Sequence, residues 1–472
     1  MSIATHAWYG QAPASAPAGA GVRRRTAGDY YLALLGAVIL GYAVAGRGFA
    51  YVGVPPVYVG EAALVLGLLV VAWEGSAMRA MSAPALAALA ALAAWTAYRT
   101  VPYLDVYGLD APRDAMVVGY GLYAVVVAGL LLARPERLVA AVRAYRTIAV
   151  VVLAVAWVVY LVVRQAPDLL PTWPWSIDTH AIEIKPGDLL VHLAAITAFL
   201  VLGFRKARPV WLVLLVLGVG IGMVGNRGGM VGYGVAMTAL VVMKPPTARF
   251  RRLAAAVVLV MALALLAGTS GIRTNEGSRV FGVEQIVENV RSIAGTSDSQ
   301  PLTTTAEWRL QWWSRIAGYT FGGPHFRDGK GFGINLATDD GFRVDQEQTL
   351  RSPHNVFMAL LARGGVPALA LWLLLQACWF GAVARAWLAA RRAGQVRWMG
   401  VLAICVVYCT AALVNASFDV HLEGPMGAIP YWTFFGAGLA AARLRVSHPD
   451  LLKALAEGPE APAAPAQKAW GW

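Results

Sequence analysis

Long runs of apolar residues, separated by short polar segments, recur along almost the whole chain. A helix needs about 20 such residues to cross roughly 30 Å of hydrocarbon, because it rises only about 1.5 Å per residue. The apolar character surrounds each run instead of following one stripe, as contact with lipid requires. The pattern therefore predicts about twelve transmembrane helices, near 30–46, 57–73, 83–101, 115–133, 147–163, 188–204, 209–225, 228–243, 253–270, 366–383, 398–415 and 426–442.

These runs predict an all-α polytopic membrane protein with one large extramembrane segment. Residues 1–29 and 443–472 are expected to be cytoplasmic tails, disordered where Ala, Pro and Gly dominate in 1–22 and 457–472. Residues 30–270 hold helices one to nine, and residues 354–442 hold an interfacial helix and helices ten to twelve. The segment 271–353 between helices nine and ten is too long for a simple connector, so we expect a partly helical lid.

The distribution of basic residues predicts the orientation. Of the 39 Lys and Arg residues, 23 lie in segments that are cytoplasmic if the N-terminus is cytoplasmic, and the short outer loops hold 6. This asymmetry follows the positive-inside rule, so both termini are predicted to be cytoplasmic and the long loop extracytoplasmic. The net charge of +13 is therefore mostly a matter of topology and gives no evidence for nucleic-acid binding.

Polar and charged side chains gather at the outer ends of the predicted helices. This indicates an outward-facing reaction or binding site, because charged groups at membrane depth are costly. A transporter would show broken helices in two related halves, and a channel would show a polar stripe, but neither pattern is present. The residues at the outer ends are Arg47, Glu61, Arg99, Arg227, His354, Arg363, Asp419, His421 and Glu423.

No cofactor or metal site is predicted. Asp105, Asp110 and Asp114 in an outer loop are the nearest approach to a set of metal ligands, and a solvated loop is the favoured interpretation. The segment "GGPHFRDGKG" (322–331) lacks the first glycine and the final Ser or Thr of a phosphate-binding loop, so nucleotide binding is not expected.

His354 opens the stretch "HNVFMALLARGG". Ser352 is a good N-cap and Pro353 suits the first helical position, so the sequence predicts a short interfacial helix over 353–363 with His354 in its first turn. The helix dipole there disfavours imidazolium, and a neutral imidazole can act as a general base. A histidine that only forms a hydrogen bond at the interface is the alternative.

Two arginines are candidates for binding a phosphate group. Arg309 shares a predicted helix face with Trp312, Trp313 and Ile316, and a guanidinium near an indole keeps its fork of donors free. The tryptophans alternatively lie at headgroup level. Arg227 lies in "GNRGGMVG" (225–232), where glycines allow a backbone or ligand to come close, although an arginine that only reaches the headgroups is the alternative.

These motifs together resemble the O-antigen ligase family, which includes lipopolysaccharide O-antigen ligases, polysaccharide polymerases and protein O-oligosaccharyltransferases. The resemblance rests on "NRGG", the Arg309 and Trp313 pair, "GKGFG" (329–333), and above all "HNVFMALLARGGVPALALWLLL" (354–375). Twelve spans with a long outer loop between spans nine and ten are also similar to that family, whose fold is of the glycosyltransferase C type.

The resemblance implies a metal-independent, inverting glycan transferase in the bacterial cytoplasmic membrane. The donor would be a glycan on a polyprenyl diphosphate, such as undecaprenyl diphosphate, and the acceptor a glycan, lipid or protein hydroxyl. His354 would be the base, and Arg227 and Arg309 would bind the diphosphate. A flippase or exporter of lipid-linked saccharides is the alternative function. Further candidates for substrate binding are Arg47, Arg99, Trp313, Asn355, Arg363, Asp419 and Glu423.

Overall fold

The computed structural model describes residues 24–76, 83–166, 169–176, 179–244, 272–273, 280–281, 300–343 and 350–455. The predicted ninth span, most of the first part of the predicted lid (271–299) and most of both predicted tails lie outside the described residues.

The described chain is mostly helical. Its first half contains α1 (Ala27–Ala45), α2 (Arg47–Ala50), β1 (Gly53–Val54), β2 (Val57–Tyr58), α3 (Val59–Trp73), α5 (Pro84–Thr100), η1 (Val101–Tyr103), α6 (Leu104–Tyr107), α7 (Asp110–Gly119), α8 (Leu122–Ala133), α9 (Glu136–Gln165), α10 (Pro186–Val201), α11 (Pro209–Gly225) and α12 (Arg227–Val242). The remainder contains β3 (Ile272–Arg273), β4 (Val280–Phe281), α15 (Gln300–Phe321), α16 (Leu336–Asp339), α17 (Val356–Arg392), α18 (Val396–Asn415), α19 (Pro425–Ser447) and η3 (Leu451–Leu455). The strands form two antiparallel pairs, β1 with β2 and β3 with β4.

Every predicted span that falls among the described residues coincides with helix, the fourth being divided between α7 and α8. Among the described residues, five helical stretches are long and apolar enough to cross a membrane. They support the predicted polytopic, mostly helical membrane protein, and they are Ala27–Ala45, Asp110–Ala133, Glu136–Val163, Val356–Arg392 and Val396–Asn415.

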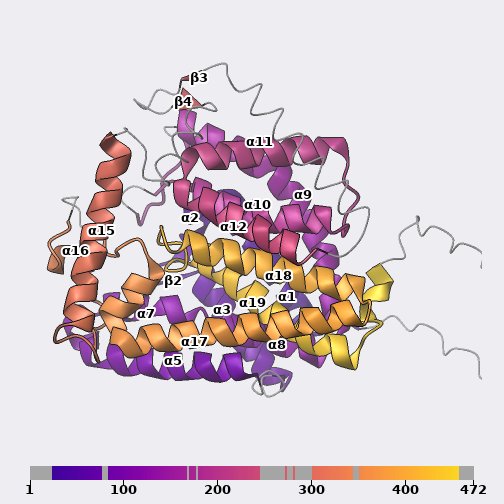
Figure 1. Ribbon diagram of the computed structural model, residues 1–472, viewed down its shortest axis with the longest axis horizontal. Coiled ribbons are helices and arrows are strands. Elements are labelled where there is room, and N and C mark those ends of the chain that lie inside the picture. The colour runs from indigo at the N-terminus through magenta and orange to yellow at the C-terminus, as the bar shows by residue number, and fades with distance from the viewer. Residues whose placement is uncertain are drawn as a thin grey trace, which may run out of the picture.

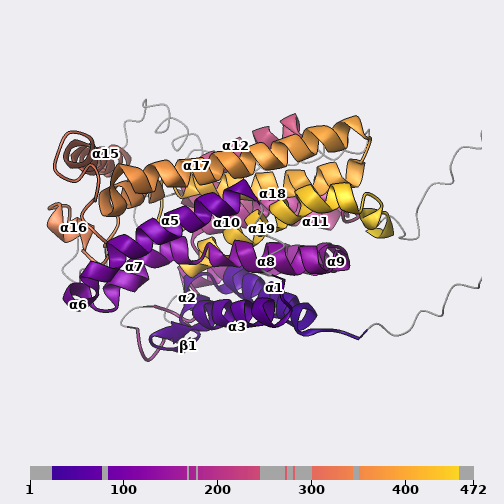
Figure 2. The same ribbon diagram turned by 90° about the horizontal axis from the view of Figure 1, so that it is seen from below.

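The helices lie side by side in a bundle. α18 packs against α10, α12 and α19, while α17 packs along α5, and α8 along α19 (Figures 1 and 2). Large aromatic side chains fill the interior, and some of them satisfy their polar atoms with nearby acceptors. The indole of Trp379, for example, donates to the carbonyl of Phe435, and Tyr431 donates to Gln376. Because these donors are satisfied, the rings can be buried without leaving unpaired polar atoms.

The start of α17 differs from the prediction. The helix begins at Val356, and its N-cap is Asn355, whose side-chain oxygen accepts from the backbone N–H groups of Phe357 and Met358. Ser352 was predicted to cap this helix, but its hydroxyl instead donates to Glu423 at 2.6 Å. Asparagine is as good an N-cap as serine, so either residue suited the pattern, and the contact with Glu423 decided between them.

The predicted end of this helix at residue 363 coincides with a break in helical geometry at Gly365. Gly365 has φ 70° and ψ −172°, which interrupts the helical geometry inside α17. The bend leaves carbonyl groups without helical partners, and Lys330 and Gly331 of "GKGFG" donate their backbone N–H groups to the carbonyls of Ala362 and Arg363 at 2.7 and 2.9 Å. This part of the predicted lid therefore completes the hydrogen bonding of the bent helix.

α15 stands across one end of the bundle, next to α16 (Figure 1). Its side chains Trp312 and Ile316 are fully buried and share a second, smaller core with α16 and the first part of α17. The indole of Trp312 donates to Asp340 at 2.7 Å. The headgroup interpretation therefore does not hold for Trp312, because its ring lies inside the protein.

Candidate active site

The candidate site is centred on Asp419, in the loop between α18 and α19. Nδ1 of His354 and Nζ of Lys185 each lie 3.5 Å from Oδ1 of this carboxylate. The backbone N–H of Val420 also donates to it, at 2.8 Å. Three separate segments therefore meet here: the residue before α10, the segment before α17, and the α18–α19 loop.

The Asp419 carboxylate stays ionised in this setting. Burial by itself would raise its pKa, but the adjacent His354 imidazole and the Lys185 ammonium outweigh burial and hold the pKa well below the ordinary value of 3.8. An ionised carboxylate only accepts hydrogen bonds, so it can orient an imidazole and stabilise the imidazolium formed when that ring takes a proton.

His354 has an unusual backbone conformation. Its φ is 53°, and in the part of the chain that the structure describes it is the only residue other than glycine with a positive φ. Such a conformation costs about 1 kcal/mol or more and persists only where neighbours impose it. Here the carbonyl of Pro353 accepts from the indole of Trp313 at 2.9 Å, and the N–H of Val356 donates to Ala416 at 2.9 Å. Both flanks of His354 are therefore anchored.

This conformation corrects the predicted setting of the histidine. His354 lies outside α17, two residues before its first residue, and not in its first turn. The helix dipole therefore does not supply the local field that the sequence suggested, because the field of a helix end falls off within a turn and the N-cap separates them. The carboxylate of Asp419 takes the place of the dipole as the nearest electrostatic partner.

Arg309 belongs to the same electrostatic environment. It lies on α15 one turn before Trp313, and its Nε is buried without a hydrogen-bond partner among the described residues. Burial lowers the pKa of its guanidinium, and the negative charge of Asp419 partly offsets that effect. A buried guanidinium with an unpaired donor is suited to an anionic ligand.

Arg227 is the first residue of α12, beside the same junction. Asn226 caps the helix by accepting from the N–H of Gly229 at 2.7 Å. A Cβ on Gly228 would lie 2.6 Å from Cβ of Phe418, and a Cβ on Gly229 would lie 2.7 Å from Cα of Gly187. The glycines of "NRGG" therefore let α12 begin in contact with the segments that carry Lys185 and Asp419. In this structure the glycines make room for the side chain of Phe418 and the backbone of Gly187.

Glu423, a predicted substrate-binding residue, lies on the other side of His354. Burial raises the pKa of its carboxyl, although the hydroxyl of Ser352 and the charge of Arg363 partly counter this. Ser352 donates to Oε1 of Glu423, which ties the segment before His354 to the α18–α19 loop. Asn355, another predicted substrate-binding residue, caps α17 through its side-chain oxygen.

Arg363 is held in an ion-pair network. Its guanidinium lies 2.7 Å from Oδ2 of Asp114 and donates to the carbonyl of Ile334. Arg351 binds the same carboxylate at 3.1 Å and Asp110 at 3.0 Å. The solvated-loop interpretation does not hold for Asp114, which is largely buried between these two arginines, whereas Asp110 pairs with Arg351 and stays partly exposed. The structure describes no cluster of three or more potential metal ligands among its residues.

The side chains of Arg47 and Arg99 bind groups outside the His354–Asp419 site. Arg47 lies 3.3 Å from Glu183, and Nε of Arg99 donates to the carbonyl of Asp328 at 2.8 Å. Neither guanidinium contacts His354 or Asp419 within the described chain. The structure thus gathers His354, Asp419, Arg309, Trp313 and Glu423 and leaves these two arginines in other contacts.

Sequence reasoning missed Lys185 and Asp188. Asp188, on the first turn of α10, pairs with the buried imidazole of His421 and lies 3.5 Å from the amide of Asn415. The buried ion pair of His421 with Asp188 therefore joins the α18–α19 loop to the start of α10. An acidic residue at the start of an apolar run was a signal that could have pointed to this pair.

Comparison with known proteins agrees with the motifs. Residues 212–373 match the family model described as O-antigen ligase, and this stretch contains Arg227, Arg309 and His354. The match confirms the resemblance predicted from the sequence. No curated protein matches the chain.

Proposed function

Because residues 212–373 match the O-antigen ligase family, we propose that this membrane protein transfers a glycan from a polyprenyl diphosphate to an acceptor hydroxyl on the outer face of the cytoplasmic membrane. The family supports a membrane glycan transferase of the ligase or polymerase type. The observation that carries the finer proposal is the His354–Asp419 pair together with the partly buried Arg309 side chain, whose Nε has no hydrogen-bond partner among the described residues.

The proposed base is His354. Its Nε2 takes the proton of the acceptor hydroxyl as that oxygen attacks the anomeric carbon of the donor. The Asp419 carboxylate, whose Oδ1 lies 3.5 Å from Nδ1, favours the tautomer with the proton on Nδ1, which leaves Nε2 free, and it stabilises the imidazolium that forms. Attack on the face opposite the diphosphate inverts the anomeric carbon.

The leaving group is a lipid diphosphate, which departs as an anion and needs its charge balanced. Arg309 and Arg227 are proposed to supply that balance through paired hydrogen bonds to the phosphate oxygens. Lys185, 3.5 Å from the same oxygen of Asp419 as His354, helps to keep that carboxylate ionised. Arginines can thus provide the positive charge that other transferases obtain from a divalent cation, so transfer is proposed to need no metal.

The direct test is reconstitution. Purified protein in vesicles is given a polyprenyl-diphosphate glycan together with a lipid, a glycan or a protein acceptor, in excess chelator. Transfer to one of the acceptors, with release of polyprenyl diphosphate, is the expected result. Movement of the intact lipid-linked glycan across the bilayer without any transfer would overturn the proposal in favour of a flippase.

A further inference from the structure

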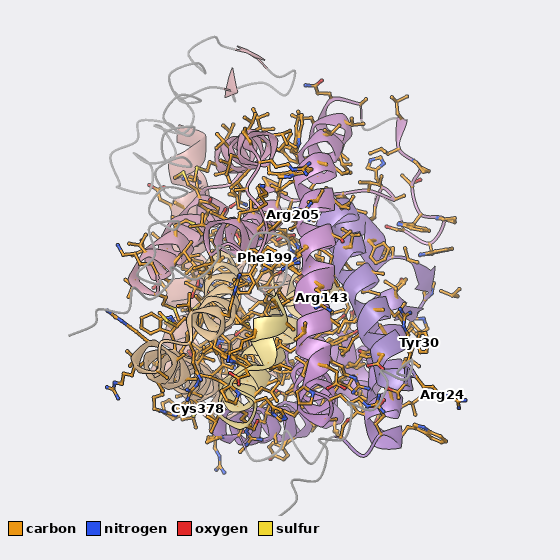
Figure 3. All side chains as sticks on the ribbon, turned by 90° about the vertical axis from the view of Figure 1, so that its right-hand side faces the viewer. Arg24, Tyr30, Arg143, Phe199, Arg205 and Cys378 are labelled. Carbon is orange, nitrogen blue, oxygen red and sulfur yellow. The ribbon has the colours of Figure 1, made fainter. Side chains whose placement is uncertain are left out.

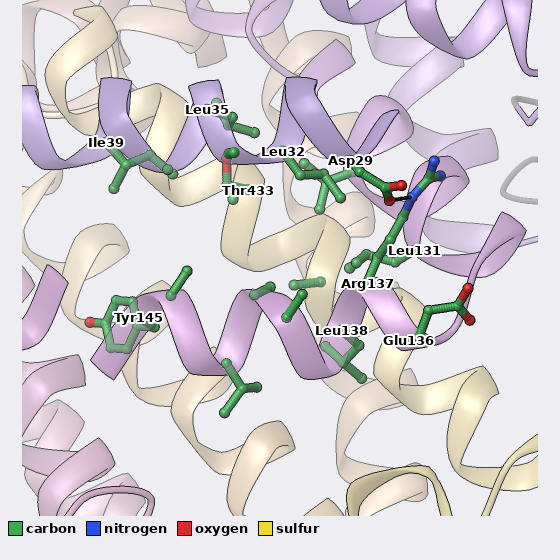
Figure 4. A pocket seen from close by; sticks show the side chains of 18 of the residues that line it. Asp29, Leu32, Leu35, Ile39, Leu131, Glu136, Arg137, Leu138, Tyr145 and Thr433 are labelled. Atoms are coloured by element: carbon green, nitrogen blue, oxygen red, sulfur yellow. Dashed lines mark hydrogen bonds and ion pairs between the residues drawn. The ribbon is translucent and has the colours of Figure 1, made fainter. Parts of the chain in front are cut away.

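A large cavity lies at the end of the bundle away from the candidate active site. It has a volume of about 520 Å³ and lies between α1 and α9, with α8, α18 and α19 behind. Figure 3 looks onto the end of the molecule where α1 begins, and Figure 4 shows the cavity between α1 above and α9 below. This volume lies within the range of about 300–1,000 Å³ that is common for ligand pockets.

The walls of the cavity are apolar, and one side is open. Leu32, Leu35 and Ile39 of α1 face Leu138 and Tyr145 of α9 across it (Figure 4). Small exposed residues, Ala33 on α1 and Ala140, Ala141 and Ala144 on α9, form its open edge. Both helices are apolar enough to cross a membrane, and on α9 this edge directly precedes the predicted span 147–163, which puts it near the boundary of the bilayer.

One hydroxyl of the cavity lining is buried without a hydrogen-bond partner among the described residues. It is Oγ1 of Thr433, on α19. A buried hydroxyl without a partner is costly, and a ligand with an acceptor atom, such as an ester carbonyl, would satisfy it.

The mouth of the cavity is basic. Arg24 and Arg25, both exposed, precede α1 and have no ion-pair partner in the described part of the chain, while Arg134 lies 3.8 Å from Asp29. Arg137 is buried and already neutralised, at 2.8 Å from both Asp29 and Glu74. Glu136 is a further acidic residue at the rim. Two unpaired guanidiniums therefore remain at the end of an apolar groove.

We propose that this groove binds an anionic phospholipid of the leaflet on the side of the termini. One acyl chain lies between α1 and α9, and the phosphate lies against Arg24 and Arg25, with Arg134 close by. Basic pockets between transmembrane helices recognise anionic lipid headgroups in this way. A neutral lipid would leave the positive charge of the two arginines uncompensated, and a zwitterionic lipid would bring its own cationic group next to them.

The test is native mass spectrometry of the full-length protein, titrated with palmitoyl-oleoyl phosphatidylglycerol and, separately, with phosphatidylcholine of the same chains. Wild type is expected to bind phosphatidylglycerol more tightly. R24Q/R25Q should lose that preference, with affinity for phosphatidylglycerol reduced roughly 30-fold, since each basic residue near an anionic lipid contributes about fivefold. The matched control, R385Q/R392Q, removes two exposed arginines on α17 that do not line the cavity.

A second variant tests the groove apart from its charges. Ala144→Trp fills the open edge of the groove and should prevent binding of phosphatidylglycerol although the arginines remain. Ala33→Trp serves the same purpose from α1. Equal binding of both lipids by wild type, equal losses in R24Q/R25Q and R385Q/R392Q, or undiminished binding in both tryptophan variants would each overturn the proposal. None of these results depends on glycan transfer.

Discussion

Nδ1 of His354 lies 3.5 Å from Oδ1 of Asp419, although the two residues belong to different loops of the bundle. The imidazole precedes α17 and the carboxylate follows α18, and the N–H of Val356 reaches back to the carbonyl of Ala416 to hold the loops together. A histidine beside an ionised carboxylate is the arrangement from which general bases are built.

Asp419 is expected to act through His354. Asp419→Asn keeps the size of the side chain but removes the charge that stabilises imidazolium, so transfer should slow by about 100-fold or more while donor binding is retained. The pH dependence of transfer should also change, because the imidazole loses its charged partner. The control is Asp450→Asn, which alters an exposed carboxylate paired with Lys453. An unchanged pH profile in D419N would show that Asp419 is only structural.

His354 is expected to be the base itself. His354→Gln keeps polarity and approximate size but cannot accept a proton, so single-turnover transfer should slow by at least ~100-fold. Binding of the lipid donor, measured on the same preparation, should remain normal. Transfer within roughly tenfold of wild type would be less than a general base supplies and would contradict this role.

Because of the positive φ at position 354, a glycine there is expected to give a more stable protein than an alanine, the reverse of the usual order. His354→Gly and His354→Ala both remove the imidazole, but only alanine retains the steric cost of φ 53°. The glycine variant should therefore be more stable than the alanine variant, by about 1 kcal/mol. Thermal unfolding in detergent measures the difference. A more stable alanine variant would mean that His354 carries no backbone strain.

Arg227 and Arg309 are each expected to need a guanidinium. Arg227→Lys and Arg309→Lys preserve the charge but lose the paired donors, so each should lose most transfer activity at normal expression. Arg385→Lys, at an exposed position on α17, is the matched control. Near-wild-type turnover in both lysine variants would remove the diphosphate-binding role.

Replacing Glu423 with glutamine is expected to stabilise the protein in a pH-dependent way. Its pKa is raised above the ordinary value of 4.5, mainly by burial, so its contribution to stability is fully present below that value and is lost as the pH rises through the raised pKa. Glu423→Gln keeps an acceptor for Ser352 and removes the buried charge. The variant should unfold at a higher temperature than wild type at pH 7.5, and the difference should shrink as the pH falls toward 4.5. A constant difference across this range would contradict the shifted pKa.

The sequence by itself determined where the described helices lie, to within a few residues, and the resemblance to the O-antigen ligase family. An apolar run of sufficient length forms a helix in lipid because each backbone group must find its partner within the segment, and this requirement is local. The end of the helix near residue 363 was also suggested locally, since two successive glycines followed by Pro367 favour a break in helical geometry. The same holds for the motif around His354, which the family match contains.

Only the tertiary structure decided which polar residues share a site. Asp419 and Arg363 looked alike in the sequence, as charges at the outer ends of helices, but Asp419 faces His354 whereas Arg363 is paired with Asp114. The cap of α17 was also undecided, because Ser352 and Asn355 both suit an N-cap and the contact of Ser352 with Glu423 settles it. These outcomes depend on which loops meet, and that is set by the packing of α10, α12 and α18, which no local pattern encodes.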